Sequence, residues 1–461
     1  MEYLRQHYGY IVVIAAFLVF GGLLSPINSY GRIFTGIQND LNTTAIQTGW
    51  IGSIAWASNF LVSPLAVFVE SHIGYCATTV LGSVITSAAY LISSFMGSYG
   101  WVLLVLGFVC GSAAGLCIHS SFCVLYKYFS PDHQTKASSV MSTGASIATI
   151  FLSISYEKLV PTFGWRTTLQ VTSVFTAVLA IPASFAIRPG LDIVRNKMEM
   201  KQVATTDCGT LEGPEESFSY KTAKPDNVHE EAPCEEESSL HSWLKMCYIW
   251  RVWLILFALL LPAMCWSVYW VNIISYFESI TIPEHDILLF VMVMTINDLL
   301  GRILLVFFIQ KIPFGETSLL CFCNFLLFAV TVFFVLFPST PVLFICSVFI
   351  GVGRGWYNIL PYRVSVDLLE SDNSDQGITL AMIALGVGFT VGTLPAGAIY
   401  DVTSSYTYAF LINAILFLLG ALILLFLQVE RRVRSKRERK RRGWTAVHSS
   451  TSRECVDTIA T

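Results

Sequence analysis

Charged residues are scarce in this chain. Aspartate, glutamate, lysine and arginine make up 13% of its 461 residues, whereas 54% are hydrophobic and the mean hydropathy is +0.63. Soluble domains typically carry about 25% charged residues, so this composition excludes an ordinary soluble multidomain protein. It indicates a chain whose solvent is largely the lipid bilayer.

The sequence also lacks the signatures of common catalytic sites. No glycine-rich loop that could cradle a phosphate follows a predicted strand, and no cysteine and histidine spacing matches a metal site. We therefore expect no enzyme activity, no cofactor, no bound metal and no nucleic-acid partner. The twelve cysteines fall in predicted helices or on cytoplasmic segments, where we expect them to be reduced.

Long apolar stretches dominate what is present. A helix needs about 20 apolar residues to cross ~30 Å of hydrocarbon, and the chain contains two groups of six such stretches. The first group lies approximately at Tyr10–Tyr30, Gln47–Val69, Thr78–Met96, Trp101–Tyr126, Ala137–Tyr156 and Arg166–Ile187. The second lies approximately at Ile249–Tyr276, Ile287–Gln310, Thr317–Phe337, Val342–Pro361, Gly377–Tyr400 and Tyr406–Leu427. The pattern predicts an all-α membrane protein with twelve transmembrane helices. No cleavage pattern follows the first stretch, so we expect it to be a retained helix.

The apolar pattern stops between the two groups. Residues 188–247 are rich in Glu, Asp, Ser, Thr and Pro, which predicts a disordered, acidic cytoplasmic linker between six-helix halves at 1–187 and 248–428. A basic tail follows at 429–461 and begins with the letters ERRVRSKRERKRR. Because basic residues near helix ends stay in the cytoplasm, the tail is expected inside, and an even helix count places the N-terminus inside too.

Two pseudo-symmetric halves of six helices joined by a long loop predict the major facilitator fold, in which the halves rock around a central site. Another polytopic protein, such as an acyltransferase or a receptor, is the alternative. The expected location is the plasma membrane.

Five short motifs spread along the chain point to one family. In order they are YGYIVVIAAFLVFGG from Tyr8, Tyr128-Phe129 with Lys136-Ala137-Ser138-Ser139 and Gly144, Phe163-Gly164-Trp165-Arg166, Asp298-x-x-x-Arg302, and Tyr400-Asp401-x-Thr403-x-Ser405-Tyr406. On these motifs the chain resembles the monocarboxylate transporter family, solute carrier family 16, of the major facilitator superfamily. It departs from the family pattern at His7, Tyr8 and Tyr10, where an acidic residue and tryptophans are usual. The resemblance implies a secondary transporter of a small organic anion, with protons as a second substrate and a single-span membrane chaperone as a partner.

Two opposite charges lie deep in the eighth predicted helix. Asp298 is about 11 residues, or about 16 Å, from the outer end of that helix, and Arg302 follows on the same face one turn later. A charge at that depth costs roughly 2.5–3.5 kcal/mol on insertion scales, so it needs a partner or a function. The pair is either a structural salt bridge or a switch in which protonation of Asp298 frees Arg302 to bind a carboxylate. The resemblance implies the second role.

The family's cation in the first helix is missing here. Proton-coupled members carry a lysine where this sequence has Asn28. Arg354 in the tenth predicted helix is also deep, and it either replaces that cation or forms a bridge to a carboxylate on an inner loop. If Arg354 faces away, a bound monoanion leaves one uncompensated negative charge, and protonation of Asp298 restores neutrality. If Arg354 faces the site, it supplies the missing charge.

The remaining candidate residues carry weaker signals. His119, Tyr269 and Asn272 lie on helices expected to line a cavity, although a lone histidine or an aromatic stripe is more often a packed residue. Asn42 starts the glycosylation pattern Asn42-Thr43-Thr44 on a short predicted outer loop. Two functional alternatives stay open: an uncoupled facilitator of aromatic or zwitterionic solutes such as amino acids, and a transport-inactive receptor or scaffold.

Overall fold

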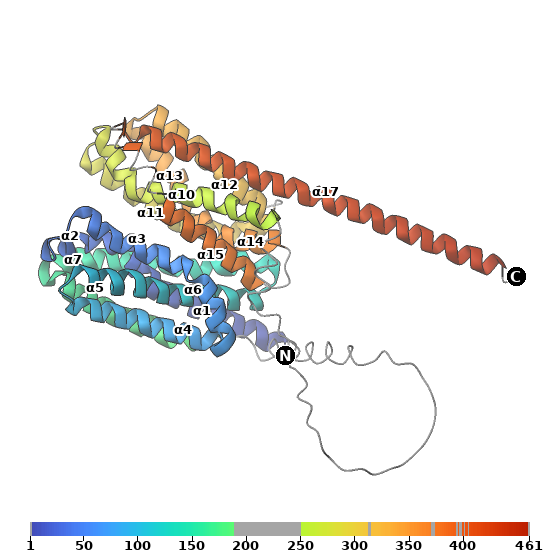
Figure 1. Cartoon of the computed structure of the whole chain (residues 1–461), viewed down its shortest axis with the longest axis horizontal. Helices are drawn as coiled ribbons and strands as arrows, with labels where there is room; N and C mark the ends of the chain where they lie inside the picture. The colour runs from blue at the N-terminus through green and yellow to red at the C-terminus, as the bar shows by residue number, and fades with distance from the viewer. Residues whose placement is uncertain are drawn as a thin grey trace, which may run out of the picture.

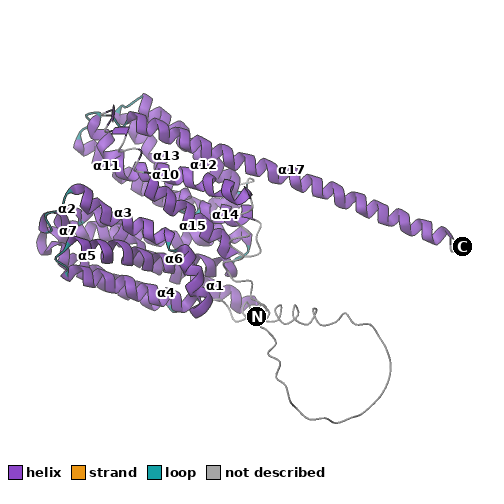
Figure 2. Ribbon diagram, viewed as in Figure 1, coloured by secondary structure: helices purple, strands orange, loops and turns teal. Residues whose placement is uncertain are grey.

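A computed structural model describes residues 2–188, 250–311, 315–369, 374–392 and 405–459, with residues 395, 399–400 and 402–403 between the last two ranges. All regular elements in this part of the chain are helices (Figure 2). The predicted all-α class is therefore confirmed. The linker predicted at 188–247 lies, except for residue 188, outside the described residues.

The first half of the chain forms a bundle of long helices with short breaks. Its elements are α1 (Glu2–Asn28), the 3-10 turn η1 (Tyr30–Arg32), α2 (Phe34–Asp40), α3 (Ala45–Leu61), α4 (Ser63–Phe95), α5 (Tyr99–Val102), the π-helical η2 (Leu103–Val109), α6 (Cys110–Tyr128) and α7 (Pro131–Ser184). The second half of the chain is also a bundle of long helices with short breaks. Its elements are α10 (Trp250–Ser279), α11 (Glu284–Phe308), η3 (Ile309–Lys311), α12 (Glu316–Leu336), α13 (Thr340–Tyr357), α14 (Leu360–Leu369), α15 (Ser374–Val391) and α17 (Thr407–Ile459).

Each of the twelve predicted spans contains a described helix, although the end of the eleventh, Gly377–Tyr400, includes residues outside the described ranges. Ten helical runs are long and apolar enough to cross a membrane. One of them, the 54-residue α7, holds both the fifth and the sixth span, because the chain turns at Gly164, where φ is 78°. The second span is α3 together with the start of α4, which turns in the same way at Gly74, where φ is 80°. Both turns need a positive φ, which glycine adopts without steric penalty.

The two bundles lie side by side in Figure 1, with α1–α7 below and α10–α17 above. Both ends of the chain leave the molecule at the same end of the bundles, which we call the terminal end. In the basic tail, α17 continues without a break from the last span to Ile459. Arginine, lysine and glutamate are strong helix formers, so the helix can extend past the apolar residues.

Glycines bring the helix backbones of each bundle close together. A Cβ atom at Gly115 of α6 would lie 2.0 Å from the Asn59 carbonyl oxygen of α3, and one at Gly144 of α7 would lie 2.2 Å from the Phe17 carbonyl oxygen of α1. Only a residue without a side chain permits these approaches. Gly107, Gly111 and Gly115 recur at a spacing of four residues, and their close contacts with α3 show that they serve packing.

Candidate substrate cavity

A cavity of about 450 Å³ lies between the two bundles. Residues from α1, α3, α6 and α7 line one side of it, and residues from α10, α11, α13 and α15 line the other. Its wall includes Gly31 and Phe34, which lie near α2 at the end opposite the terminal end (Figure 1). The cavity therefore lies at the interface of the two halves, the usual position of a substrate site in such two-lobed transporters.

Asp298 and Arg302 lie together at the wall of this cavity. Arg302 Nη2 lies 3.1 Å from Asp298 Oδ2, and both side chains are almost fully buried. Arg302 Nη1 donates to the Ser142 carbonyl oxygen at 2.7 Å, and Ser146 Oγ donates to Asp298 Oδ2 at 3.1 Å. Because both serines belong to α7, the pair on α11 joins the two halves of the molecule.

Arg354 faces the same site from α13. Its Nε lies 3.8 Å from Asp298 Oδ1, and its guanidinium lies 3.7 Å from the centre of the Trp270 ring. Asn358 follows directly after the end of α13 at Tyr357, and its amide donates to Asp298 Oδ1 at 3.3 Å. No side-chain hydrogen bond of normal length holds the Arg354 guanidinium within the described ranges, so its donors are available to a bound anion.

The charges of this site do not cancel. Arg302 and Arg354 line the cavity, whereas Asp298 lies behind them, and no acidic residue is present among the described residues of the lining. Two cations and one carboxylate leave one positive charge. A net charge in a low-dielectric environment is costly until a counterion arrives.

Aromatic side chains form the apolar part of the lining. Trp56 and Phe60 of α3 stack with Phe389 of α15, and the rings of Phe60 and Phe389 are 5.8 Å apart and nearly parallel. Phe122 and Tyr362 stack at 4.1 Å. These surfaces suit the apolar or planar body of an organic solute.

The other predicted site residues lie in different environments. Asn28 lines the cavity and donates to Thr149 Oγ1 at 3.1 Å. Tyr269 does not line it: the ring is buried inside the second bundle and its hydroxyl contacts Thr331 Oγ1 at 2.6 Å. Asn272 is also buried outside the lining, and its amide nitrogen has no hydrogen-bond partner among the described residues. Asn42 is exposed after α2, with a φ of 48°.

His119 lies outside the cavity, and this corrects the placement expected from the sequence. Its ring is fully buried nearer the terminal end, with Nδ1 2.9 Å from Glu70 Oε1 and Nε2 2.9 Å from Thr379 Oγ1. Cys123 lies beside the ring. Glu70, His119 and Cys123 are metal-ligating residue types within 4.8 Å of one another, but hydrogen bonds already engage both ring nitrogens, so we assign no metal centre here.

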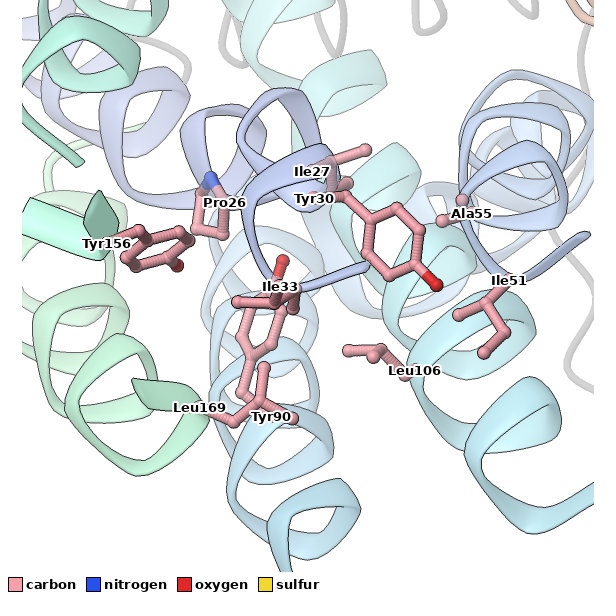
Figure 3. Close-up of a pocket in the computed structure, with 11 residues that line it drawn as sticks. Pro26, Ile27, Tyr30, Ile33, Ile51, Ala55, Tyr90, Leu106, Tyr156 and Leu169 are labelled. Carbon is pink, nitrogen blue, oxygen red and sulfur yellow. The ribbon is translucent and has the colours of Figure 1, made fainter. Parts of the chain in front are cut away.

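A second hollow is too small for an organic solute. It measures about 20 Å³ and lies between α1, α3, α4, η2 and α7, with Tyr30, Tyr90 and Tyr156 in its wall (Figure 3). A space of this size holds about one water molecule. The hydroxyl of Tyr90 has no hydrogen-bond partner in the described part of the chain, so such a water would have a donor or acceptor to bind.

Polar contacts between the halves close the cavity at the terminal end. Lys127 Nζ of α6 lies 3.0 Å from Asp375 Oδ2 of α15, and Tyr75 donates to the same oxygen at 2.7 Å. Thr135 of α7 donates to Glu316 Oε1 of α12 at 3.1 Å. At the opposite end the lining residues Gly31 and Ser53 are exposed, so the cavity can be reached from that side.

Several residues of the site carried no signal in the sequence. Asn358 and the stack of Trp56, Phe60 and Phe389 line the cavity, and Ser146 contacts Asp298 behind it, but all are common residue types in apolar helices. A polar residue directly after the end of a helix within a predicted span, as at Asn358, could have indicated a break.

Comparisons with known proteins support the same fold. The family model described as Major Facilitator Superfamily matches residues 9–314 and 255–454. Monocarboxylate transporter 12 of Homo sapiens is 23% identical over 445 residues, covering 93% of this chain and 82% of the relative. Monocarboxylate transporter 10 of Danio rerio is 22% identical over 427 residues, covering 90% and 77%. The resemblance drawn from the motifs is confirmed by these relatives.

Solved structures with the same architecture include two sugar transporters. The proton:xylose symporter XylE has a TM-score of 0.66 at 11% identity, covering 91% of this chain and 96% of that structure. The E. coli fucose:proton symporter FucP has a TM-score of 0.62 at 14% identity, covering 91% and 99%. At these identities the likeness concerns the fold alone.

Proposed function

The chain belongs to the major facilitator superfamily, and on this basis we propose that it carries a small organic monocarboxylate across the membrane by alternating access. The observation that carries the proposal is the arrangement of charge in the cavity. Arg302 and Arg354 face the cavity while Asp298 lies behind them. A single carboxylate bound between the two guanidinium groups completes the charge balance and receives planar, charge-assisted hydrogen bonds.

The aromatic lining supports a carboxylate with an apolar body. A ring or branched chain extending from the carboxylate would meet the stacked Trp56, Phe60 and Phe389. Zwitterionic amino acids fit less well, because their ammonium group needs a negatively charged hydrogen-bond acceptor. Among the described residues, the carboxylate in contact with the two arginines is Asp298, and it already receives hydrogen bonds from Ser146 and Asn358.

The position of Arg354 bears on proton coupling. Arg302, Arg354, ionised Asp298 and a monoanion sum to zero charge, so the loaded site needs no proton for neutrality. The geometry therefore favours a facilitator of monoanions over an obligatory proton symporter. In this mechanism Asp298 orients both arginines while it remains ionised.

We propose that the terminal end is cytoplasmic and that the cavity opens to the outside at the plasma membrane. The support is the basic sequence after the last span and the exit of both chain ends on one side (Figure 1). Epitope tags in the linker and in the tail should stay unlabelled in intact cells and become labelled after permeabilisation. Labelling of either tag in intact cells would reverse the orientation.

Uptake of a radiolabelled panel tests the transport proposal. The panel contains lactate, phenylacetate, phenylacetamide and phenylalanine, given to cells that express the chain at the surface. Phenylacetate should enter by saturable transport, whereas phenylacetamide, which has the same body without the charge, should not. Equal entry of the acid and the amide above that of control cells would refute the anion site. Uptake of no panel member would favour a receptor or scaffold.

A further inference from the structure

A buried hydrogen-bonded group at the closed end of the molecule joins three helices. Glu70 of α4 and His119 of α6 come from the first half, and Thr379 of α15 comes from the second. The relative exposure is 6% for Glu70 and 0% for the other two residues. Ser63 of α4 also donates to the Thr379 carbonyl oxygen at 3.5 Å, so the two halves are in direct contact here.

The hydrogen bonds of this group fix how many protons it holds. The Thr379 hydroxyl donates to the Asp375 carbonyl oxygen at 2.7 Å, so its oxygen accepts from His119 and Nε2 must carry a hydrogen. Glu70 Oε1 already receives the Ser120 hydroxyl at 2.6 Å, and it lies 2.9 Å from His119 Nδ1. A carboxylate oxygen and an unprotonated ring nitrogen at that distance would repel each other, so one further proton lies between them.

We propose that Glu70 and His119 form a proton-binding site that holds the cytoplasmic end closed, so that cytoplasmic acidity favours the outward-open state. With this proton the pair is neutral as a unit, whichever of the two residues carries it. Without it, a carboxylate would be buried with no balancing charge, which is costly. The proposal rests on the orientation and the alternating access proposed above.

The opening of the cytoplasmic end would release this proton. Rocking of the halves separates α15 from α4 and α6, which removes the Thr379 acceptor and exposes His119 to water. An exposed imidazole titrates near pH 6.5, so at neutral pH it gives up the proton to the cytoplasm. When the end closes again, a proton returns from the same side. This proton therefore regulates the cycle and is not transported.

The neighbouring charged and titratable groups do not replace this pair. They are Tyr75 on α4, Cys117, Cys123 and Lys127 on α6, and Asp375 on α15. Lys127 and Asp375 neutralise each other, with Tyr75 donating to Asp375. In water, free phenols and thiols titrate well above neutral pH and carboxylates well below it, so the exposed histidine is the group that changes charge between about pH 6 and pH 8.

The expected effect follows from linkage. The closed end binds one proton more than the open end when the cytoplasm is above about pH 6.5, so the ratio of closed to open changes up to about tenfold per pH unit. Below about pH 6.5 both states hold the proton and the ratio levels off. Acidification of the cytoplasm therefore increases the outward-open fraction.

A cysteine reporter in the outer cavity measures that fraction without any substrate. Ser53 lines the cavity and is exposed, so the Ser53→Cys variant should react with a membrane-impermeant maleimide from outside. The external pH is constant, which keeps the reagent chemistry constant, and the cytoplasm is clamped at values from about pH 8 to about pH 6. We expect the labelling rate to rise severalfold, up to about tenfold, and to reach a plateau near pH 6.5.

Two substitutions at the site and one control, each in the Ser53→Cys background, decide the outcome. His119→Gln should label at a rate that does not depend on cytoplasmic pH, whereas the matched control His72→Gln, an exposed histidine of α4, should keep the parent profile. If His119→Gln does not reach the surface, Thr379→Val removes the acceptor and should flatten the profile or move it to lower pH. A flat profile in the parent, or an unchanged profile in the two site variants, would overturn the inference.

The two proposals fail separately. Labelling needs no carboxylate, so a flat profile would leave the transport proposal intact. Absence of uptake with a normal pH profile would refute the carboxylate proposal and leave the proton site in place.

Discussion

Replacing Arg354 by glutamine separates the charge of this residue from its shape. The guanidinium lies 3.8 Å from Asp298 and 3.7 Å from the Trp270 ring centre, so glutamine can fill much of the same space without the positive charge. In the variant, Arg302 and Asp298 neutralise each other before the solute binds. A monoanion then adds one uncompensated negative charge to a low-dielectric cavity.

The size of the effect can be bounded from these distances. Two unit charges about 4 Å apart interact by about 4 kcal/mol at an effective dielectric constant of about 20. Both groups give up hydration, so the net value of a hydrogen bond to a charged group, about 1.5–3 kcal/mol, is the better guide. This corresponds to a loss of about ten- to a hundredfold in carboxylate uptake at low substrate concentration.

The pH dependence gives the prediction its specificity. Protonation of Asp298 removes the excess negative charge in Arg354→Gln, so the defect should shrink as the external pH falls from about 7.5 to about 5.5. Parent uptake should change little over the same range, because its loaded site is already neutral. The assay is initial uptake of labelled phenylacetate, corrected for surface expression and for entry into control cells.

A matched variant tests whether any arginine at this end of the molecule has the same effect. Arg32 is exposed in η1 and is not part of the cavity lining. Arg32→Gln should therefore retain nearly normal uptake at both pH values. Equal losses in Arg354→Gln at both pH values, or no loss at all, would refute the charge balance on which the mechanism depends.

Three further substitutions test other parts of the account. Arg302→Ala should abolish phenylacetate uptake while surface expression stays measurable, because Asp298 keeps Arg354 as a partner; normal uptake would reduce the pair to a structural bridge. Gly144→Ala should lower the thermal stability of the purified protein, since overpacking costs about 1–3 kcal/mol, whereas Gly97→Ala, with nothing within 4 Å of the added Cβ, should not. Lys127→Asp should slow external labelling of the cavity reporter by about fivefold or less, and adding Asp375→Lys should restore it; no recovery would mean that the ion pair does not close the terminal end.

The sequence could predict those contacts of the site that join residues close together in the chain. Asp298 and Arg302 are four residues apart on one helix, so helical geometry alone places them together. The inward position of Arg354 could not be predicted in this way, because it depends on how α13 packs against α11. The contact of Asn358 with Asp298 depends on the same packing, because Asn358 follows α13 whereas Asp298 lies on α11.

The candidate residues that were expected in the cavity but lie elsewhere also depend on helix packing, which the sequence does not give. On α10, Ser267, Trp270 and Val271 face the cavity, whereas Tyr269 faces Thr331 in the core of the bundle. Periodicity identifies such faces but does not say which of them meets the other half of the molecule. His119 likewise lies on an inward face of α6, but at a depth where the halves are in contact rather than separated by the cavity.

Transport by the purified protein in lipid vesicles tests the central claim most directly. The account predicts saturable uptake of labelled phenylacetate into vesicles that contain the parent chain, no uptake above background with Arg302→Ala, and no competition by phenylacetamide. Phenylacetate uptake that persists in Arg302→Ala, or that phenylacetamide inhibits as well as unlabelled phenylacetate does, would contradict the claim that paired arginines recognise the solute through its negative charge.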